Sequence, residues 1–130
     1  MAASIRDLKV WQEAVALAAE IVRTFRQNAR RETKVVSDQL MLTALTAAST
    51  IADGYGRYTG PEQRQLYRVA KREFLRLETQ LAIARQADLL SANVHADLSG
   101  RTQSVMRMLG GYLVYLERQL ATENAGNGKV

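Results

Sequence analysis

The sequence predicts an all-α fold, an up-down-up-down antiparallel four-helix bundle. Apolar residues recur at spacings of three and four through almost the whole chain, and no segment alternates as a β-strand does. One proline and eight glycines leave few breaks between these segments. Helices of about 20 residues joined by short loops are typical of such a bundle.

The length of 130 residues suits one domain with a hydrophobic core. We assign residues 1–120 to a single bundle domain, and the polar, glycine-containing residues 121–130 to a flexible tail. The N-terminus lacks an apolar run of the signal-peptide type, and no stretch reaches the roughly 18 apolar residues of a membrane span. We therefore expect a cytoplasmic protein with no membrane partner.

The first predicted helix begins at Asp7 or Leu8 and ends near Asn28, with Asp7 as its N-cap. One apolar stripe follows helical spacing: Trp11, Ala14, Val15, Ala18, Ile21, Val22 and Phe25. This stripe is the expected core face, and Trp11 belongs to it.

The second predicted helix, between about residues 33 and 53, has no charged residue from Gln39 through Ala52. A helix that is apolar on most sides is buried on most sides, whereas a bundle helix normally keeps one face in water. Either this helix is unusually enclosed or its outer face meets another subunit. We favour the subunit interface, and assign Met41, Leu42 and Leu45 to it.

Glycines at positions 54 and 56 are predicted to end the second helix, and Pro61 fits the first position of the third. The spacing Gly54-x-Gly56-x-x-x-Gly60 does not make a P-loop, because it follows a helix and no Gly-Lys-Ser/Thr closes it. Tyr55 and Tyr58 beside Arg57 could stack on bases, although packing over the bundle end is the simpler role.

The third predicted helix, ending near Asp88, carries arginines at four-residue spacing: Arg64, Arg68, Arg72 and Arg76, with Lys71 alongside. Like charges at this spacing cost a few tenths of a kcal/mol per pair, and an anion on that face would compensate. At 100 degrees per residue this stripe lies opposite the core stripe. Leu75 sits among the arginines, so we add it to the oligomer interface.

The basic stripe has three interpretations. It is a solvated face, a surface that tracks phosphates, or a surface that pairs with Glu73, Glu78 or Asp88 of another subunit. The overall charge is +5, and most of the 18 basic residues are arginines. Both observations favour a polyanionic partner.

The fourth predicted helix starts after Ser91, a good N-cap. Gly110 and Gly111 in its interior cost about 1 kcal/mol each relative to alanine, and would permit a close approach of another helix.

The amino-acid composition gives little indication of a catalytic site or a metal site. The chain has no cysteine and only His95, so thiolate zinc sites, a cysteine nucleophile and a histidine-based metal site are not expected. The inward carboxylates and histidine of a di-metal bundle are also missing. We therefore predict no enzyme, no cofactor and no metal.

Three segments resemble one family. RDLKVWQEA (Arg6 to Ala14), STIADGYGR (Ser49 to Arg57) and LETQLAIARQADLLS (Leu77 to Ser91) are similar to motifs of the four-helix-bundle proteins named for intervening sequences in 23S ribosomal RNA genes. The resemblance implies a bundle that assembles as a ring, a homopentamer. It also implies kinship with the accessory protein of diversity-generating retroelements, a basic pentamer that associates with a reverse transcriptase and nucleic acid.

The chain departs from the family pattern in two places. Met41 and Leu42 stand where the family usually has a basic pair, and Lys71, Arg72 and Arg76 stand where it has small or acidic residues. Positive charge is therefore expected on the third helix instead of the second.

The leading hypothesis is a non-enzymatic homo-oligomer that binds RNA or DNA backbone. One role that fits this hypothesis is that of an accessory protein to a reverse transcriptase. The predicted contacts are Arg57, Arg64, Arg68, Lys71, Arg72 and Arg76. The alternative is a protein–protein interaction scaffold with no nucleic-acid partner, which the charge-free second helix and Leu75 support.

Overall fold

A computed structural model describes residues 4–27, 30–57 and 59–127. The long helices are α1 (Lys9–Phe25), α2 (Lys34–Tyr55), α3 (Gly60–Gln86) and α4 (Ala92–Asn127). Two short 3-10 helices, η1 (Ile5–Asp7) and η2 (Arg31–Thr33), precede α1 and α2. These ranges contain no strand, so the predicted all-α class is confirmed, and the four long helices fit a four-helix bundle.

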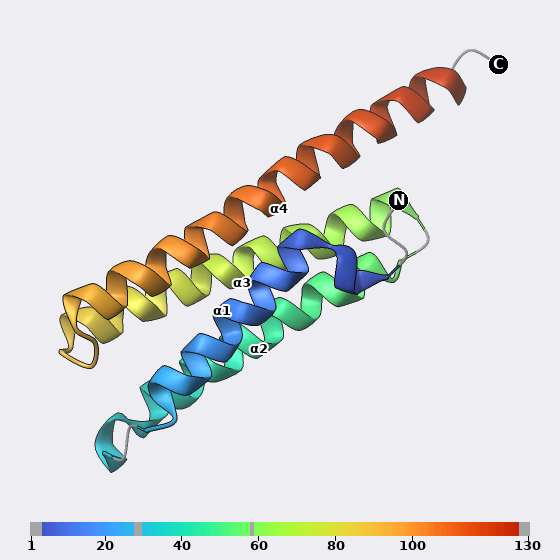
Figure 1. The fold of residues 1–130 in the computed structure, drawn as a ribbon. Helices are drawn as coiled ribbons and strands as arrows, with labels where there is room; N and C mark the ends of the chain where they lie inside the picture. The colour runs from blue at the N-terminus through green and yellow to red at the C-terminus, as the bar shows by residue number, and fades with distance from the viewer. Residues whose placement is uncertain (1–3, 28–29, 58, 128–130) are drawn as a thin grey trace.

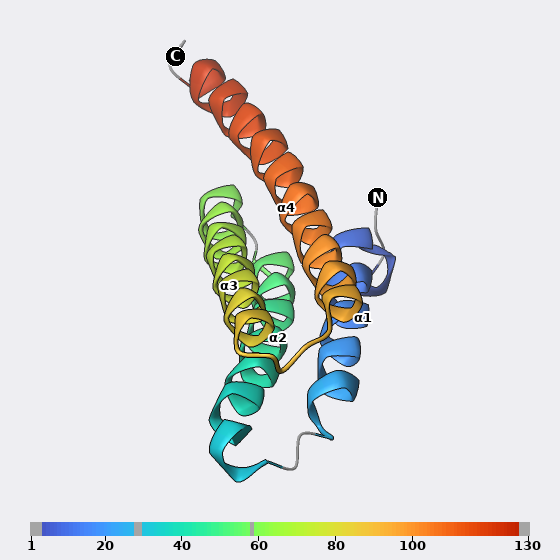
Figure 2. The same ribbon diagram turned by 90° about the vertical axis from the view of Figure 1, so that its left-hand side faces the viewer.

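Neighbouring helices pack in the cyclic order α1, α2, α3, α4, with α4 closing back onto α1. The α2–α3 contact is the most extensive of the four, and the α1–α4 contact is the least. Figure 1 shows the connections from α1 to α2 and from α3 to α4 at one end of the molecule. The C-terminal part of α4 projects past the other helices at the opposite end in both Figure 1 and Figure 2.

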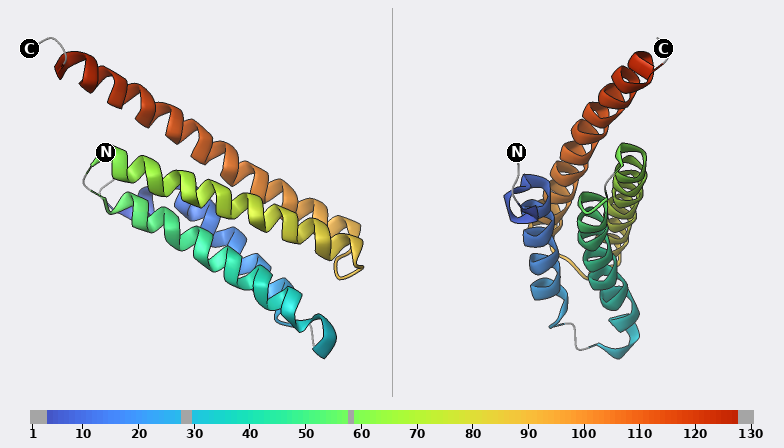
Figure 3. Two further views of the ribbon diagram at one scale, coloured as in Figure 1. Left: turned by 180° about the vertical axis from the view of Figure 1, so that it is seen from behind. Right: turned by 90° about the vertical axis from the view of Figure 1, so that its right-hand side faces the viewer.

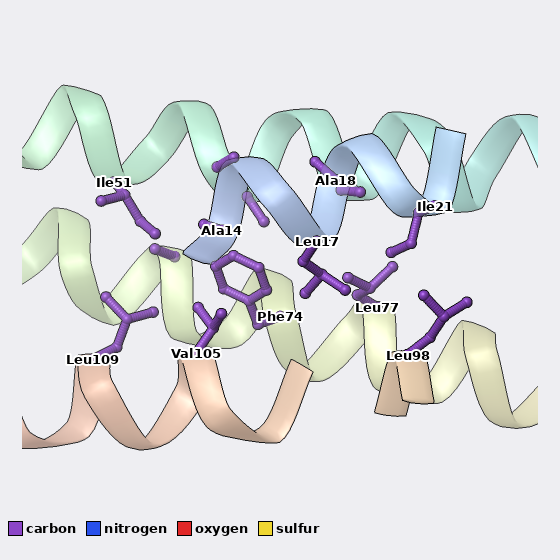
Figure 4. Close-up of a cluster of buried hydrophobic side chains, with 14 of the residues drawn as sticks. Ala14, Leu17, Ala18, Ile21, Ile51, Phe74, Leu77, Leu98, Val105 and Leu109 are labelled. Atoms are coloured by element: carbon purple, nitrogen blue, oxygen red, sulfur yellow. The ribbon is translucent and has the colours of Figure 1, made fainter. Parts of the chain in front are cut away.

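All four helices contribute apolar side chains to one core (Figure 4). Leu17 and Ile21 of α1 meet Phe74 and Leu77 of α3, and Leu98 from α4 lies beside them. Burying one such side chain contributes about 1.5–3 kcal/mol. Four members of the predicted α1 stripe are buried, namely Ala14, Ala18, Ile21 and Phe25. Trp11 and Val22 are only partly buried, Val15 is 40% exposed, and the fully buried Leu17 was not part of the predicted stripe.

The start of α1 differs from the prediction. Asp7 is the last residue of η1, and Leu8 occupies the N-cap of α1 without a side-chain hydrogen bond. Ser4 caps η1 instead, because its hydroxyl accepts from the Arg6 amide at 3.1 Å. The expected end near Asn28 lies outside the described residues, and α1 as described ends at Phe25.

Gly54 does not end α2 as predicted. It lies within the last turn and is buried, while Gly56 holds the C-cap position. A Cβ at Gly54 would come within 2.9 Å of Tyr67 Cε1 on α3. Gly54 therefore permits a close approach of α2 and α3, which the sequence pattern of a helix stop did not indicate.

The predicted start signals, Pro61 for α3 and Ser91 for α4, lie at the starts of these helices. Pro61 is the second residue of α3, not the first, and Thr59, which was not predicted, caps the helix by accepting from the Glu62 amide at 3.3 Å. Ser91 caps α4 by accepting from the Val94 amide at 3.2 Å. Between these helices Asp88 takes a left-handed conformation with φ of 64°, which reverses the chain after α3.

Helix α4 continues to Asn127, beyond the expected end of the domain at residue 120. Residues 121–125 contain no glycine or proline, so the helix can continue through them, and it ends next to Gly126. Residues 128–130 of the expected tail lie outside the described range.

One helical segment, Arg31–Tyr55, is long and apolar enough to cross a membrane by length and composition. Within the bundle 44% of its most apolar window is buried. The expectation that no segment meets this criterion was therefore too strict. Core packing accounts for the buried part of α2, whereas Leu42 and Leu45 remain exposed.

Candidate nucleic-acid interface

The basic stripe of α3 faces away from the core. Arg68, Lys71, Arg72 and Arg76 are exposed, and Arg64 is partly buried. Core residues on the same helix, such as Phe74 and Leu77, are almost fully buried. The charged and apolar faces of α3 therefore lie where the angles between its residues predict them.

Three of these cations line one groove between α3 and α4, with a volume of ≈ 500 Å³. We call it the α3/α4 groove. From α3 come Arg68, Lys71, Arg72 and Leu75, and from α4 come Met106, Gly110, Leu113, Val114 and Glu117. Its wall is therefore cationic and much of its floor is apolar.

Among the residues that the structure describes, one of the three groove cations has an acidic partner. Arg68 donates to Glu117 Oε1 at 2.8 Å, which bridges α3 and α4. Both side chains are about half exposed, so the pair contributes about 0–1 kcal/mol. Among the described residues no ion pair forms at Lys71, Arg72 or Arg76.

Gly110 contributes to the open shape of this groove. A Cβ there would lie 3.6 Å from Lys71 Nζ, whereas a Cβ at Gly111 would have nothing within 4 Å. The expected close helix approach at these two glycines is therefore wrong. Gly110 instead lies at the surface of the groove, where a side chain would occupy space beside the lysine.

Three of the six predicted contacts do not line the groove. Arg76 is exposed one turn of α3 beyond Arg72, and Arg57 is exposed after the end of α2. Arg64 precedes Arg68 by one turn and does not line the groove either. Tyr58, considered with Arg57 for base stacking, lies outside the described residues. The structure thus brings together Arg68, Lys71 and Arg72 out of the six predicted contacts.

The predicted interface residues divide between two places. Leu42 and Leu45 on α2 are 57% and 53% exposed, so α2 is not enclosed by its own chain. Met41 is partly buried and packs on the core. Leu75 is 53% exposed, but it lies in the α3/α4 groove on the other side of the bundle.

A second groove, of ≈ 680 Å³, runs between α1 and α2, and we call it the α1/α2 groove. Its lining is largely apolar and includes Trp11, Val15, Val22 and Leu45. Helices α1 and α2 pack against each other along this groove (Figure 3). Arg23 at this groove pairs with Glu20 at 2.6 Å, and that hydrogen bond lowers the pKa of the Glu20 carboxyl.

A tyrosine cluster joins α3 to α4 near the start of α3. The rings of Tyr67 and Tyr112 meet edge to face at 5.1 Å, and Tyr115 contacts Tyr112 at 6.0 Å. Burial raises the pKa of both the Tyr67 and the Tyr112 hydroxyl. The Tyr67 hydroxyl is buried and has no hydrogen-bond partner in the described part of the chain.

Sequence reasoning missed the contribution of α4 to the site. Glu117, Met106 and Leu113 gave no signal of their own, because the register of α4 against α3 decides which of its residues meet the basic stripe. The described residues also contain no group of three His, Cys, Asp or Glu side chains that could hold a metal ion.

Comparison with known proteins places the chain in a family. The family model described as 23S rRNA-intervening sequence protein matches residues 6–111. A crystal structure of a protein with unknown function from the S23 ribosomal protein family of Bacteroides thetaiotaomicron is similar in fold, with a TM-score of 0.75 at 12% identity over 80% of this chain and 97% of that chain. Comparison with curated proteins finds no match. The chain belongs to the 23S rRNA-intervening sequence protein family.

Proposed function

We propose that this protein is a non-enzymatic nucleic-acid-binding bundle that contacts the RNA or DNA backbone through the exposed basic face of α3. The observation that carries the proposal is the α3/α4 groove, where Arg68, Lys71 and Arg72 gather beside a single carboxylate, Glu117. Arginine suits phosphate because its planar fork donates two hydrogen bonds at once.

The dimensions of the basic face support a backbone partner. Arg64 to Arg76 spans twelve residues of α3, or about 18 Å at 1.5 Å per residue. This length can meet several successive phosphates. Neutralising phosphates releases condensed counterions, which favours binding whatever the base sequence. We expect affinity without strong sequence preference.

The assembly we propose is a ring-shaped homopentamer of up-down-up-down antiparallel bundles, acting in the cytoplasm. The apolar α1/α2 groove and the exposed Leu42 and Leu45 support a self-association surface on the side away from the α3/α4 groove. A ring would repeat the basic face in every subunit, which raises avidity for a long polyanion. The biological role that the family kinship suggests is that of an accessory protein to the reverse transcriptase of a diversity-generating retroelement.

The direct test replaces Arg64, Arg68, Arg72 and Arg76 by glutamine. Gel shift and fluorescence anisotropy at about 50 mM salt should show binding abolished, and the dependence of log K on log salt flattened. Circular dichroism and light scattering should show the fold and assembly unchanged, because these side chains lie outside the core. Unchanged binding of the folded variant would contradict the proposal.

A second candidate function is an interaction scaffold for another polypeptide, favoured by the apolar α1/α2 groove with Leu45 exposed at its edge. This function predicts that a defined protein is retained from nuclease-treated lysate. Retention that Leu45→Glu abolishes, together with no oligonucleotide binding by the wild type, would favour it.

A further inference from the structure

We infer that the α3/α4 groove takes unpaired nucleotides, with phosphates on its cationic wall and a base on its apolar floor. This inference rests on the proposed function and narrows it from nucleic acid in general to single-stranded nucleic acid. The groove itself supports this choice, since it combines two kinds of surface that a duplex could not use together.

The apolar floor is open to solvent. Leu75 on α3 is 53% exposed and Val114 on α4 is 47% exposed, and Met106 and Leu113 complete the lining between them. Leu75 lies on the same side of α3 as Arg72 and Arg68, which precede it by three and seven residues, or about one and two turns. A flat apolar group that covered this floor would remain within reach of the cations.

A duplex presents phosphates at its surface and keeps its base faces stacked inside. It could contact Arg72 and Lys71 but would leave Leu75 and Val114 uncovered. An unpaired nucleotide exposes a base face and a phosphate together, and single-strand binding proteins use that combination of stacking surface and basic groove. Aliphatic side chains here take the place of the aromatic platform, so base identity should matter little.

Gly110 leaves room for the base. It lines the groove, and any side chain added there would project beside Lys71 Nζ, 3.6 Å from the Cβ position. The adjacent Gly111 is exposed, does not line the groove and has open space around it. The two glycines therefore offer a matched pair of sites on one helix.

The experiment compares Gly110→Leu with Gly111→Leu in the full chain. Both changes replace glycine by a good helix former inside α4, so both variants should fold at least as well as the wild type. Anisotropy is measured with a mixed-sequence single-stranded oligonucleotide and with the duplex of the same length, at one salt concentration. The wild type should bind the single strand about tenfold more tightly, the effect expected from one well-covered apolar contact.

We expect Gly110→Leu to remove that preference by weakening single-strand binding, while duplex binding stays within about twofold and Gly111→Leu behaves as the wild type. Equal wild-type affinity for both ligands, or an unchanged preference in Gly110→Leu, would overturn the inference and leave the proposed function standing. Failure of the wild type to bind either ligand would overturn the proposed function and the inference with it.

Discussion

The α3/α4 groove and the α1/α2 groove both have apolar floors, yet they differ in how their charges are compensated. In the α3/α4 groove Arg68, Lys71 and Arg72 face one carboxylate. In the α1/α2 groove Arg23 is paired with Glu20 of its own helix, and Asp53 adds a negative charge. Exposed apolar surface alone therefore does not distinguish the sites; the excess of positive charge does.

This difference assigns different partners to the two grooves. A surface with uncompensated cations repels a second copy of itself and attracts a polyanion. A nearly neutral apolar groove suits another apolar surface. Leu45 lines this groove, and Leu42 is exposed three residues earlier on α2.

The largest effect, on the oligomeric state, is expected from negative charges introduced on the exposed face of α2. Leu42→Glu with Leu45→Glu should convert the proposed oligomer to a monomer, because buried like charges at a repeated interface are strongly unfavourable. Light scattering gives the mass, and circular dichroism checks that the monomer is folded. The matched variant Leu75→Glu, in the other groove, should leave the mass unchanged. A wild type that is monomeric at micromolar concentration would remove the assembly proposal.

The next largest effect is expected at the close approach of α2 and α3. Gly54→Ala should destabilise the protein by about 1–3 kcal/mol, because its Cβ would lie 2.9 Å from Tyr67 on α3. Urea unfolding measures the change. Gly56→Ala is the control, since its Cβ would meet only backbone oxygens of α2 at 3.6 Å and beyond. Equal stability of the two variants would show that Tyr67 shifts without cost.

A single charge from each groove sharpens the comparison further. Arg72→Gln should weaken oligonucleotide binding about threefold to tenfold and reduce the salt slope by about 1, the result of losing one phosphate contact. Arg23→Gln should change neither, because Arg23 is paired and lies in the other groove. Anisotropy titrations at several salt concentrations provide both quantities. Equal losses in the two variants would mean that net charge, and not the groove, determines binding.

The smallest effect at neutral pH concerns Tyr67, which packs α3 against α4. The buried Tyr67 hydroxyl has no hydrogen-bond partner in the described residues. The free energy of unfolding of Tyr67→Phe should therefore equal that of the wild type or exceed it by up to about 1 kcal/mol. Burial raises its folded pKa above the ordinary 10.0, so the unfolded chain ionises first. Wild-type stability should therefore fall relative to the variant above about pH 10, and the difference should be constant below. Denaturant unfolding at several pH values measures it, and marked destabilisation at pH 7 would indicate a hydroxyl partner.

The sequence predicted the helices well because the apolar period and the capping residues are local signals. Ser91, Pro61 and the opposed faces of α3 all lie where local rules place them. Gly54 was misassigned because glycine near a helix end has two uses, and only the position of Tyr67 on the next helix separates them.

The candidate site was predicted only on its α3 side. The spacing of Arg68 and Arg72 showed a charged face, but which residues of α4 lie opposite depends on the relative register of two helices. Glu117 and Gly110 enter the site through that register. The pair of glycines was the one sequence signal on α4 that could have indicated this site. We expected the pair to allow a close approach of another helix, but Gly110 lines the α3/α4 groove.

The length of α4 has a consequence for local opening. Its buried residues, from Leu98 to Leu116, lie against the rest of the bundle, whereas residues 121–126 are all exposed. The rate of amide hydrogen exchange should therefore vary along this one helix. Amides near Leu109 should exchange only when the whole protein unfolds, whereas amides past Leu120 should exchange fast because the helix end frays. Because the α3/α4 groove occupies the middle of this gradient, a bound strand should slow exchange there and shift the point where α4 begins to fray.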